Sequence, residues 1–277
     1  MLFRSYISPT QLDQLVTRIN KEPVNFTIHV GDIKSGSTLC SDDMFAQVYS
    51  QFMAFEKPLI YTPGDNEWTD CHRKNNGPFD PIERLNKIRS LFFSSNQSLG
   101  RQPLPLEAQS AQAAYRIYSE NRRWTIENVS FATIHMVGSN NNDQPELPSS
   151  SEFKLRNQAN IAWMRETFAL ARKQGHQAVV LAMQADTFYG ASKQPESGFA
   201  DWLAAFQQEV SHWNKPVLLI QGDSHVFKVD HPLKDKGSGL DLVQRVVVPG
   251  AQLTNAVVIE VDSNGKIPIF TFSLLLH

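Results

Sequence analysis

The sequence predicts one domain of the α+β class, in which helices and strands alternate first and antiparallel strands come last. In the first half, apolar strand-like runs are separated by amphipathic helical patterns, and the final segments are mostly strand-like. The chain has 277 residues, of which 41% are apolar, and this is enough for one large core. No apolar run approaches the ~20 residues that a membrane-spanning helix needs.

The individual elements follow from hydrophobic periodicity and from the turn residues between them. The chain is expected to open just before a helix, because Ser8 and Pro9 are typical of a helix start. Helices are expected over residues 9–21, 42–55, 81–93, 155–174 and 198–213. Strands are expected over residues 24–30, 58–61, 113–120, 123–129, 130–138, 177–183, 215–221, 226–230, 241–250, 256–262 and 266–274. The polar stretch 139–152 is expected to be a surface loop and a candidate flap.

Five of the predicted strands end in polar clusters. These are Gly31-Asp32, Gly64-Asp65-Asn66-Glu67, Gly138-Ser139-Asn140-Asn141, Gln184-Ala185-Asp186 and Gly222-Asp223-Ser224-His225. A single Gly-Asp after a strand is weak evidence, because turns favour both residues. Five such ends in one chain are stronger, since ligands of α/β proteins bind at the carboxyl edges of strands. Oxygen-rich side chains at such an edge predict a site for hard or borderline metal ions.

The two cysteines each follow one of the first two Gly-Asp turns. Cys40 lies eight residues after Asp32, and Cys71 lies six residues after Asp65. If the two strands are neighbours, a disulfide would brace the rim of the site and imply an oxidising compartment. The alternative is a pair of free, buried thiols.

The order and spacing of these clusters resemble the motifs of the calcineurin-like metallophosphoesterase superfamily over nearly the whole chain. HVGDIKSGS is similar to the Gly-Asp segment of that family, and GDSHVF stands where Gly-His-x-His is usual. More narrowly, IHVGDIKSG with GDNEWTDCHR resembles a bacterial branch of exported members. The resemblance implies a four-layer αββα sandwich, with two mixed β-sheets flanked by helices and two metal ions at the carboxyl ends of the central strands.

The resemblance assigns metal ligands residue by residue. Asp32 matches the carboxylate that bridges both metals, Asn66 the amide ligand of the second metal, and His225 the last histidine, a ligand of the first metal. Asp223 stands where a histidine ligand is usual, and either completes the coordination or caps a turn. Gln184 also replaces a histidine, and a structural hydrogen bond is the expected role for its uncharged side chain. The oxygen-rich set favours manganese, iron, magnesium or calcium over zinc alone.

Three residues are candidates for the catalytic roles. Glu67 replaces the family's acid histidine, and beside cations its carboxylate should ionise, so we expect it to act as a ligand or orienting group. His72 could supply the missing proton, and Arg73 has a planar donor fork that suits phosphate oxygens. The alternative for His72 and Arg73 is a solvated pair on a loop.

The first family motif, an Asp on an upstream strand, is absent, and its place falls near Met1 to Arg4. Either the gene model starts too late or the protein has lost the motif. We expect truncation of the single domain 1–277, which would leave a gap or an uncovered edge in the sheet. The location would be periplasmic or secreted if a signal peptide upstream of Met1 has been lost, and cytoplasmic for the chain as given.

These features predict a hydrolase, namely a metal-dependent phosphatase that hydrolyses a small phosphate mono- or diester at a dinuclear site. The alternatives are a non-catalytic relative that binds metal or a phosphorylated ligand, and an interaction module with a vestigial site. The formal net charge of -2 gives no overall field that attracts nucleic acid. The sequence identifies no protein partner.

Overall fold

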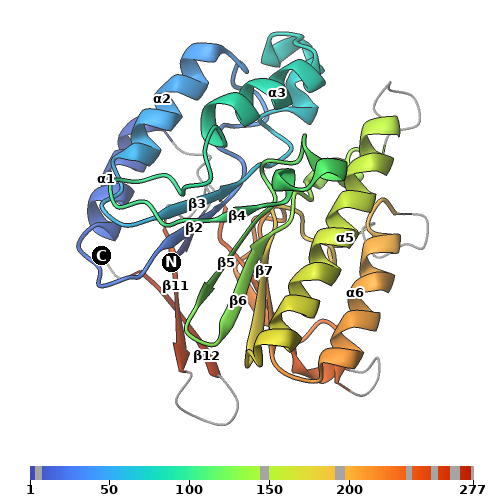
Figure 1. Ribbon diagram of the computed structural model, residues 1–277. Helices are drawn as coiled ribbons and strands as arrows, with labels where there is room; N and C mark the ends of the chain where they lie inside the picture. The colour runs from blue at the N-terminus through green and yellow to red at the C-terminus, as the bar shows by residue number, and fades with distance from the viewer. Residues whose placement is uncertain are drawn as a thin grey trace.

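The computed structural model describes residues 1–3, 8–143, 150–190, 197–234, 239–250, 255–262 and 269–275. Its strands form two sheets that face each other, with helices on both outer sides (Figure 1). The result is the α+β arrangement with mixed sheets that the sequence predicts. Within the described residues, no helix is both long and apolar enough to cross a membrane.

The first sheet has the strand order β12-β11-β1-β2-β3. Its strands are β1 (Leu2–Phe3), β2 (Thr27–Val30), β3 (Leu59–Thr62), β11 (Val257–Asp262) and β12 (Ile269–Leu274). Strands β1, β2 and β3 are parallel, whereas β11 is antiparallel to both β1 and β12. The expectation that the chain opens just before a helix is therefore wrong, because β1 precedes that helix and enters the middle of the sheet. Strand β1 carries no acidic residue.

Three helices cover the outer face of this sheet: α1 (Pro9–Ile19), α2 (Asp42–Met53) and α3 (Pro81–Phe92). Ser8 caps α1 as expected, and its side chain forms a capping box with Gln11. The buried face of the helices, including Leu15, Phe52 and Ile88, packs against the sheet in one apolar cluster. This packing fixes the turns that follow β2 and β3.

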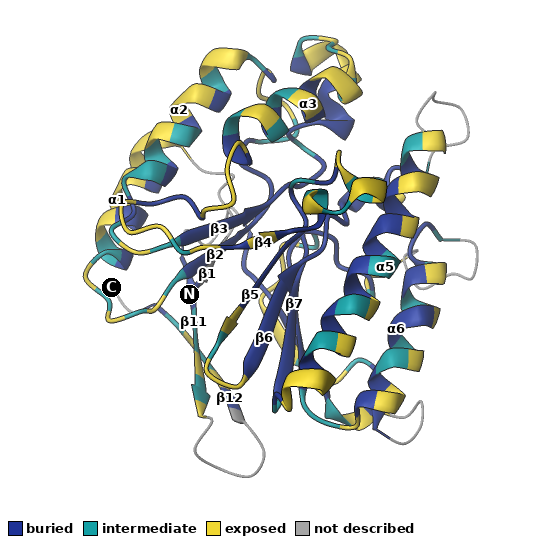
Figure 2. Ribbon diagram, in the orientation of Figure 1, coloured by how far each residue is buried: buried dark blue, intermediate teal, exposed yellow. Residues whose placement is uncertain are grey.

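The second sheet has the order β4-β5-β6-β7-β8-β10-β9. Its strands are β4 (Glu107–Ala108), β5 (Arg122–Ile126), β6 (Val129–Thr133), β7 (Ala178–Ala182), β8 (Val217–Gln221), β9 (Lys228–Asp230) and β10 (Val243–Val247). Helices α5 (Ser150–Gln174) and α6 (Ala200–Trp213) cover its outer face with a tryptophan-rich cluster. Figure 2 shows β6 and β7 in the dark blue of buried residues beside α5. A third apolar cluster fills the space between the two sheets.

One predicted strand, 113–120, is wrong. The segment instead forms short 3₁₀ turns, including Ala113–Tyr115, and Ile117 is 59% exposed. Ile117 therefore has no neighbouring layer to cover it, whereas Tyr118 in the same segment is buried.

The predicted surface loop 139–152 is wrong at its start, because residues up to Asn141 belong to the short helix α4 (Gly138–Asn141) and Asn141 is buried. Residues 144–149 lie outside the described residues, and the part from Ser150 onward belongs to α5.

Candidate metal centre

The turns after β2 and β3 lie in direct contact. A Cβ atom on Gly31 would lie 2.5 Å from the backbone nitrogen of Gly64 and 2.6 Å from its Cα atom. Gly31 has φ +74°, which glycine adopts without strain. The two glycines are required because a side chain on Gly31 would force the turns apart. This close approach brings Asp32 and Asp65 together.

Three aspartates converge at this edge. Asp32 follows β2, Asp65 follows β3 and Asp223 follows β8, so both sheets contribute. Each offers a carboxylate oxygen, and these oxygens lie within 4.8 Å of one another. Asp32 and Asp65 are buried, and Asp223 is half-buried. We call these three residues the acidic trio.

Sequence reasoning proposed Asp32 and Asp223 as ligands but overlooked Asp65, because the family resemblance directed attention to the neighbouring Asn66. The signal was present, since all three members of the trio follow a glycine at a strand end.

Gln184, directly beyond β7, lies at the centre of the trio. Its Oε1 accepts a hydrogen bond of 2.6 Å from the Gly138 backbone N–H, so its Nε2 must face the carboxylates. That nitrogen donates to both Asp32 carboxylate oxygens (3.3 and 3.2 Å), to Asp65 Oδ1 (3.1 Å) and to Asp223 Oδ1 (3.3 Å). The hydrogen bond expected of Gln184 is present, and its role toward a metal ion stays a prediction.

The donor set fits a hard cation. Four carboxylate oxygens surround one point, and oxygen ligands suit magnesium, manganese or calcium. These ions need oxygen distances of about 2.0–2.6 Å, and an amide nitrogen is not a ligand. An ion at this point therefore requires the Gln184 side chain to turn away from the trio.

Glu67 lies beneath the trio and is completely buried. Its Oε1 accepts hydrogen bonds from the Gly64 N–H (2.6 Å), the Asp32 N–H (3.2 Å) and the Tyr61 hydroxyl (2.8 Å). Burial raises the pKa of Glu67 to about 7, against these hydrogen bonds, which favour the charged form. The carboxyl group thus joins the β2 and β3 turns, an arrangement that favours an orienting role.

Lys34 and Asp70 add two perturbed groups near the β2 and β3 turns. Lys34 is only 4% exposed, and burial lowers its pKa to about 8, an effect that the charges of Glu67, Asp70 and Asp65 oppose. Burial and the neighbouring Asp65 raise the pKa of Asp70 to about 6. Perturbed groups clustered in this way are typical of functional sites.

The remaining predicted residues lie around the trio. Asn66 is half-buried, and its Oδ1 lies beside Gly36, 3.2 Å from where a Cβ on that glycine would be. His225 is exposed and packs against Gly250. His72 is exposed and its Nδ1 lies 2.7 Å from the Thr69 carbonyl oxygen, while Arg73 forms a 2.7 Å ion pair with Asp70. Neither Asn66 nor His225 belongs to the acidic trio, and the roles of these four residues stay predictions.

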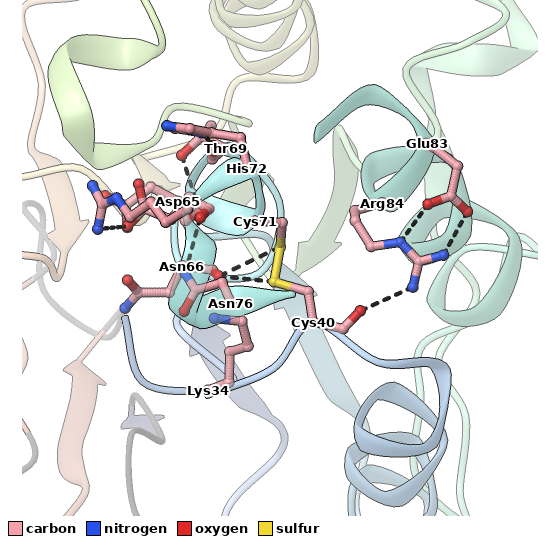
Figure 3. The surroundings of a disulfide bond; sticks show 12 residues. Lys34, Cys40, Asp65, Asn66, Thr69, Cys71, His72, Asn76, Glu83 and Arg84 are labelled. Carbon is pink, nitrogen blue, oxygen red and sulfur yellow. Dashed lines mark hydrogen bonds and ion pairs between the residues drawn. A yellow bond between two sulfur atoms is a disulfide. The ribbon is translucent and has the colours of Figure 1, made fainter. Parts of the chain in front are cut away.

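Cys40 and Cys71 form a disulfide, as expected from their positions (Figure 3). Their Cα atoms are 5.8 Å apart, and both sulfur atoms lie close to the backbone oxygen of Asn66, at 3.8 and 3.9 Å. Arg84 of α3 donates to the Cys40 carbonyl oxygen (2.9 Å) and so ties the bridge to the helical layer. The bond suggests an oxidising, non-cytoplasmic location.

Comparison with known proteins identifies a shared fold. No protein-family model matches the chain, and no curated protein matches it. A solved structure titled "Structure of PhoD" matches with a TM-score of 0.59 and 13% sequence identity, over 92% of this chain. The chain spans 56% of the length of that PhoD chain. This likeness shows that the chain shares the fold of that structure, which agrees with the α+β sandwich of mixed sheets described above.

Proposed function

We propose that this protein is a metal-dependent phosphoesterase that hydrolyses a small phosphate mono- or diester. The observation that carries the proposal is the acidic trio, in which three carboxylates from two sheets meet at the carboxyl ends of the strands. The fold shared with PhoD and the order of the sequence motifs support the same function. The disulfide beside Asn66 supports a role outside the cytoplasm.

Asp32, Asp65 and Asp223 would hold one ion, His225 is the proposed histidine ligand of the first metal, and Asn66 is the proposed ligand of the second. A bound divalent ion would polarise the phosphoryl group and lower the pKa of a water molecule. Glu67 holds the turns that carry Asp32 and Asp65, so it fixes the spacing of two ligands. Lys34 and Arg73 would offset the negative charge of the phosphate group.

His72 is the proposed proton donor to the leaving group. Its Nδ1 lies 2.7 Å from the Thr69 carbonyl oxygen, so Nδ1 carries a hydrogen that donates to that oxygen. The donor form is therefore the protonated ring, whose Nε2–H would give its proton to the leaving oxygen and leave a neutral ring with the proton on Nδ1. The ring is exposed on the loop that follows Glu67, so a substrate can reach it.

One observation favours a second candidate, a non-catalytic relative that binds metal or a phosphorylated ligand. The Gln184 amide donates to all three aspartates, and so supplies part of the neutralisation that a cation would supply. A protein that retains this amide in place would bind metal weakly and turn over little or no ester.

The two candidates separate in one experiment. The purified protein is analysed for bound metal, titrated with Mn²⁺ by calorimetry, and assayed on p-nitrophenyl phosphate and bis-p-nitrophenyl phosphate. Metal-dependent turnover that is lost in Asp32→Asn establishes the phosphoesterase, and the titration gives one or two ions per chain. Metal binding without turnover of any phosphate ester supports the second candidate instead.

A further inference from the structure

The segment after β6 has a rare backbone conformation. Four consecutive residues, Ser139 to Asn142, have positive φ angles between 52° and 59°. For residues with a side chain this left-handed region is strained, and asparagine tolerates it better than serine does. We call residues Ser139–Asn142, which overlap α4, the left-handed turn. Strain of this kind persists only where the surrounding structure holds it, and it concentrates at functional sites.

Buried polar groups hold the left-handed turn in place. Arg156 is completely buried and donates to Asn141 Oδ1 (2.7 Å) and to the Asn141 backbone oxygen (2.8 Å). The Gly198 N–H donates to Asn140 Oδ1 (2.9 Å), and Asn141 Nδ2 donates to the Gly198 carbonyl oxygen (2.9 Å). The side chains of Asn140 and Asn141 therefore serve the scaffold. The Ser139 side chain, in contrast, contacts the metal centre.

Ser139 binds one oxygen of a proposed metal ligand. Its Oγ donates to Asp65 Oδ2 (3.0 Å), while Asp65 Oδ1 accepts from Gln184 Nε2 at the centre of the acidic trio (3.1 Å). Gly138 backs the same Oδ2, since a Cβ atom on this glycine would lie 2.7 Å from it. Asp32, by comparison, accepts from Gln184 with both carboxylate oxygens. Asp65 thus offers a single oxygen to the centre.

Holding one oxygen of a carboxylate affects which ions the carboxylate suits. Calcium takes roughly six to eight oxygen ligands and can bind a carboxylate through both oxygens. Magnesium needs a near-octahedral shell at shorter distances, and manganese also takes octahedral oxygen sites. A hydrogen bond to Oδ2 keeps Asp65 from binding an ion through both oxygens and aims Oδ1 at the ion. Loss of an outer-shell partner of this kind typically lowers metal affinity by about 10–100-fold.

We propose that Ser139 is a specificity-determining residue of the metal centre. It holds the Asp65 carboxylate in a one-oxygen mode that selects Mn²⁺ or Mg²⁺ over Ca²⁺, and the left-handed turn holds Ser139 against that carboxylate. The proposal rests on the metal centre proposed above, and it narrows the set of hard cations that the centre accepts. Glycine would adopt the backbone conformation of Ser139 without strain, so the hydroxyl group is the feature that serine adds at this position.

The test compares Ser139→Gly with wild type by calorimetric titration with Mn²⁺ and, separately, with Ca²⁺. Glycine removes the hydroxyl group and fits the positive φ angle, so the variant is expected to fold, which its melting temperature in EDTA checks. The Mn²⁺ affinity should fall by about tenfold while the Ca²⁺ affinity stays the same, so the preference for Mn²⁺ falls by about tenfold. The matched control is Asn214→Gly, at an exposed left-handed residue (φ +50°) that ends α6, and it should leave both affinities unchanged.

Three outcomes with a metal-binding wild type would overturn the proposal. Equal losses of Mn²⁺ and Ca²⁺ affinity in Ser139→Gly would show that the hydroxyl group only stabilises the site. Unchanged affinities would show that it has no role, and a wild type that prefers Ca²⁺ would reverse the selectivity. A wild type that binds no Mn²⁺, or binds it no more tightly than Asp65→Asn does, would instead refute the metal centre itself and this inference with it. Mn²⁺ binding that depends on Asp65 therefore separates the two failures.

Discussion

The two halves of the candidate metal centre are built differently. The half from the first sheet carries Asp32 and Asp65 on turns that are locked by Glu67, by glycine contacts and by a disulfide. The half from the second sheet carries Asp223 and Gln184, and its exposed His225 lies outside the trio. The first half is therefore a preformed cradle, whereas the second half determines whether a cation or an amide neutralises it.

The difference teaches where function is decided in this fold. Backbone hydrogen bonds to a buried carboxylate and a covalent bridge fix geometry, and they do so with or without an ion. The Gln184 amide lies among the three carboxylates and can rotate, so its position determines whether a metal ion occupies the site. Substitutions of the groups that lock the first half, namely Glu67 and the two cysteines, should therefore change stability, whereas substitutions of the aspartates and of Gln184 should change metal affinity.

The largest expected effect is on the unfolding free energy, and it concerns the disulfide in the first half of the metal centre. Replacing both cysteines, Cys40→Ser with Cys71→Ser, should lower the unfolding free energy by about 3–4 kcal/mol, since the bridge closes a loop over a sequence separation of 31. Urea unfolding of the variant and of the wild type measures the difference. A loss below about 1 kcal/mol would mean that the turns hold without the bridge.

The second effect concerns the pH dependence of the metal-free protein, measured in EDTA. Folded Glu67 keeps its proton up to about pH 7, but the unfolded chain releases it near the ordinary pKa of 4.5. Between these values the folded state binds more protons, so the unfolding free energy falls as the pH rises, by at most about 3 kcal/mol.

Glu67→Gln should remove most of this slope, because glutamine keeps an acceptor for the backbone N–H groups and does not titrate. The slope that remains combines Asp70, whose pKa is raised to about 6 and which acts in the same direction, with His135, whose pKa burial lowers and which acts in the opposite direction. Urea unfolding at pH 5.0 and pH 7.5 tests both proteins. An unchanged slope in Glu67→Gln would show that another group is responsible.

The third effect tests the trio itself. Asp65→Asn removes one charge from the cluster, and we expect Mn²⁺ affinity to fall by on the order of 100-fold, with any phosphoesterase turnover lost. Calorimetric titration gives the affinity, and Asp201→Asn, at an exposed acid on α6, is the matched control. Equal affinities for wild type and Asp65→Asn would place the metal elsewhere.

The smallest expected effect concerns Gln184 alone, in the second half of the metal centre. Gln184→Ala removes the amide that an ion must displace. The Mn²⁺ affinity should therefore rise by about tenfold, because the ion no longer competes with the hydrogen bonds of that amide. In EDTA the same variant should be less stable by about 1–2 kcal/mol, because the carboxylates lose their donor. Weaker metal binding in Gln184→Ala would show that Gln184 assists the ion rather than competing with it.

Much of the fold and part of the site follow from the sequence. The strand-Gly-Asp pattern placed Asp32 and Asp223, and the positions of Cys40 and Cys71 predicted their bond, because parallel strands bring their carboxyl ends to one edge. The same pattern contained Asp65, which a strict alignment to the family motif obscured. The local Gly-Asp sequence predicts where each turn lies, whereas the alignment to the family motif only assigns a role to each residue of the turn.

Other features depend on contacts between distant residues. The burial of Glu67 and its hydrogen bonds to Tyr61 and the backbone arise from the packing of two turns against each other. The hydrophobic periodicity of the sequence does not predict such packing. The orientation of Gln184 depends on the Gly138 N–H, 46 residues away in the sequence. The segment 113–120 reads as a strand from its alternating residues, but no neighbouring layer covers Ile117.

The most direct test of the account is the position of the ion. Crystals grown with Mn²⁺ would be measured at the manganese absorption edge, so that anomalous scattering locates the metal. We expect a peak within coordination distance of Asp32, Asp65 and Asp223, with the Gln184 amide turned away. A peak at another site, or none with the amide still bonded to the three aspartates, would contradict it.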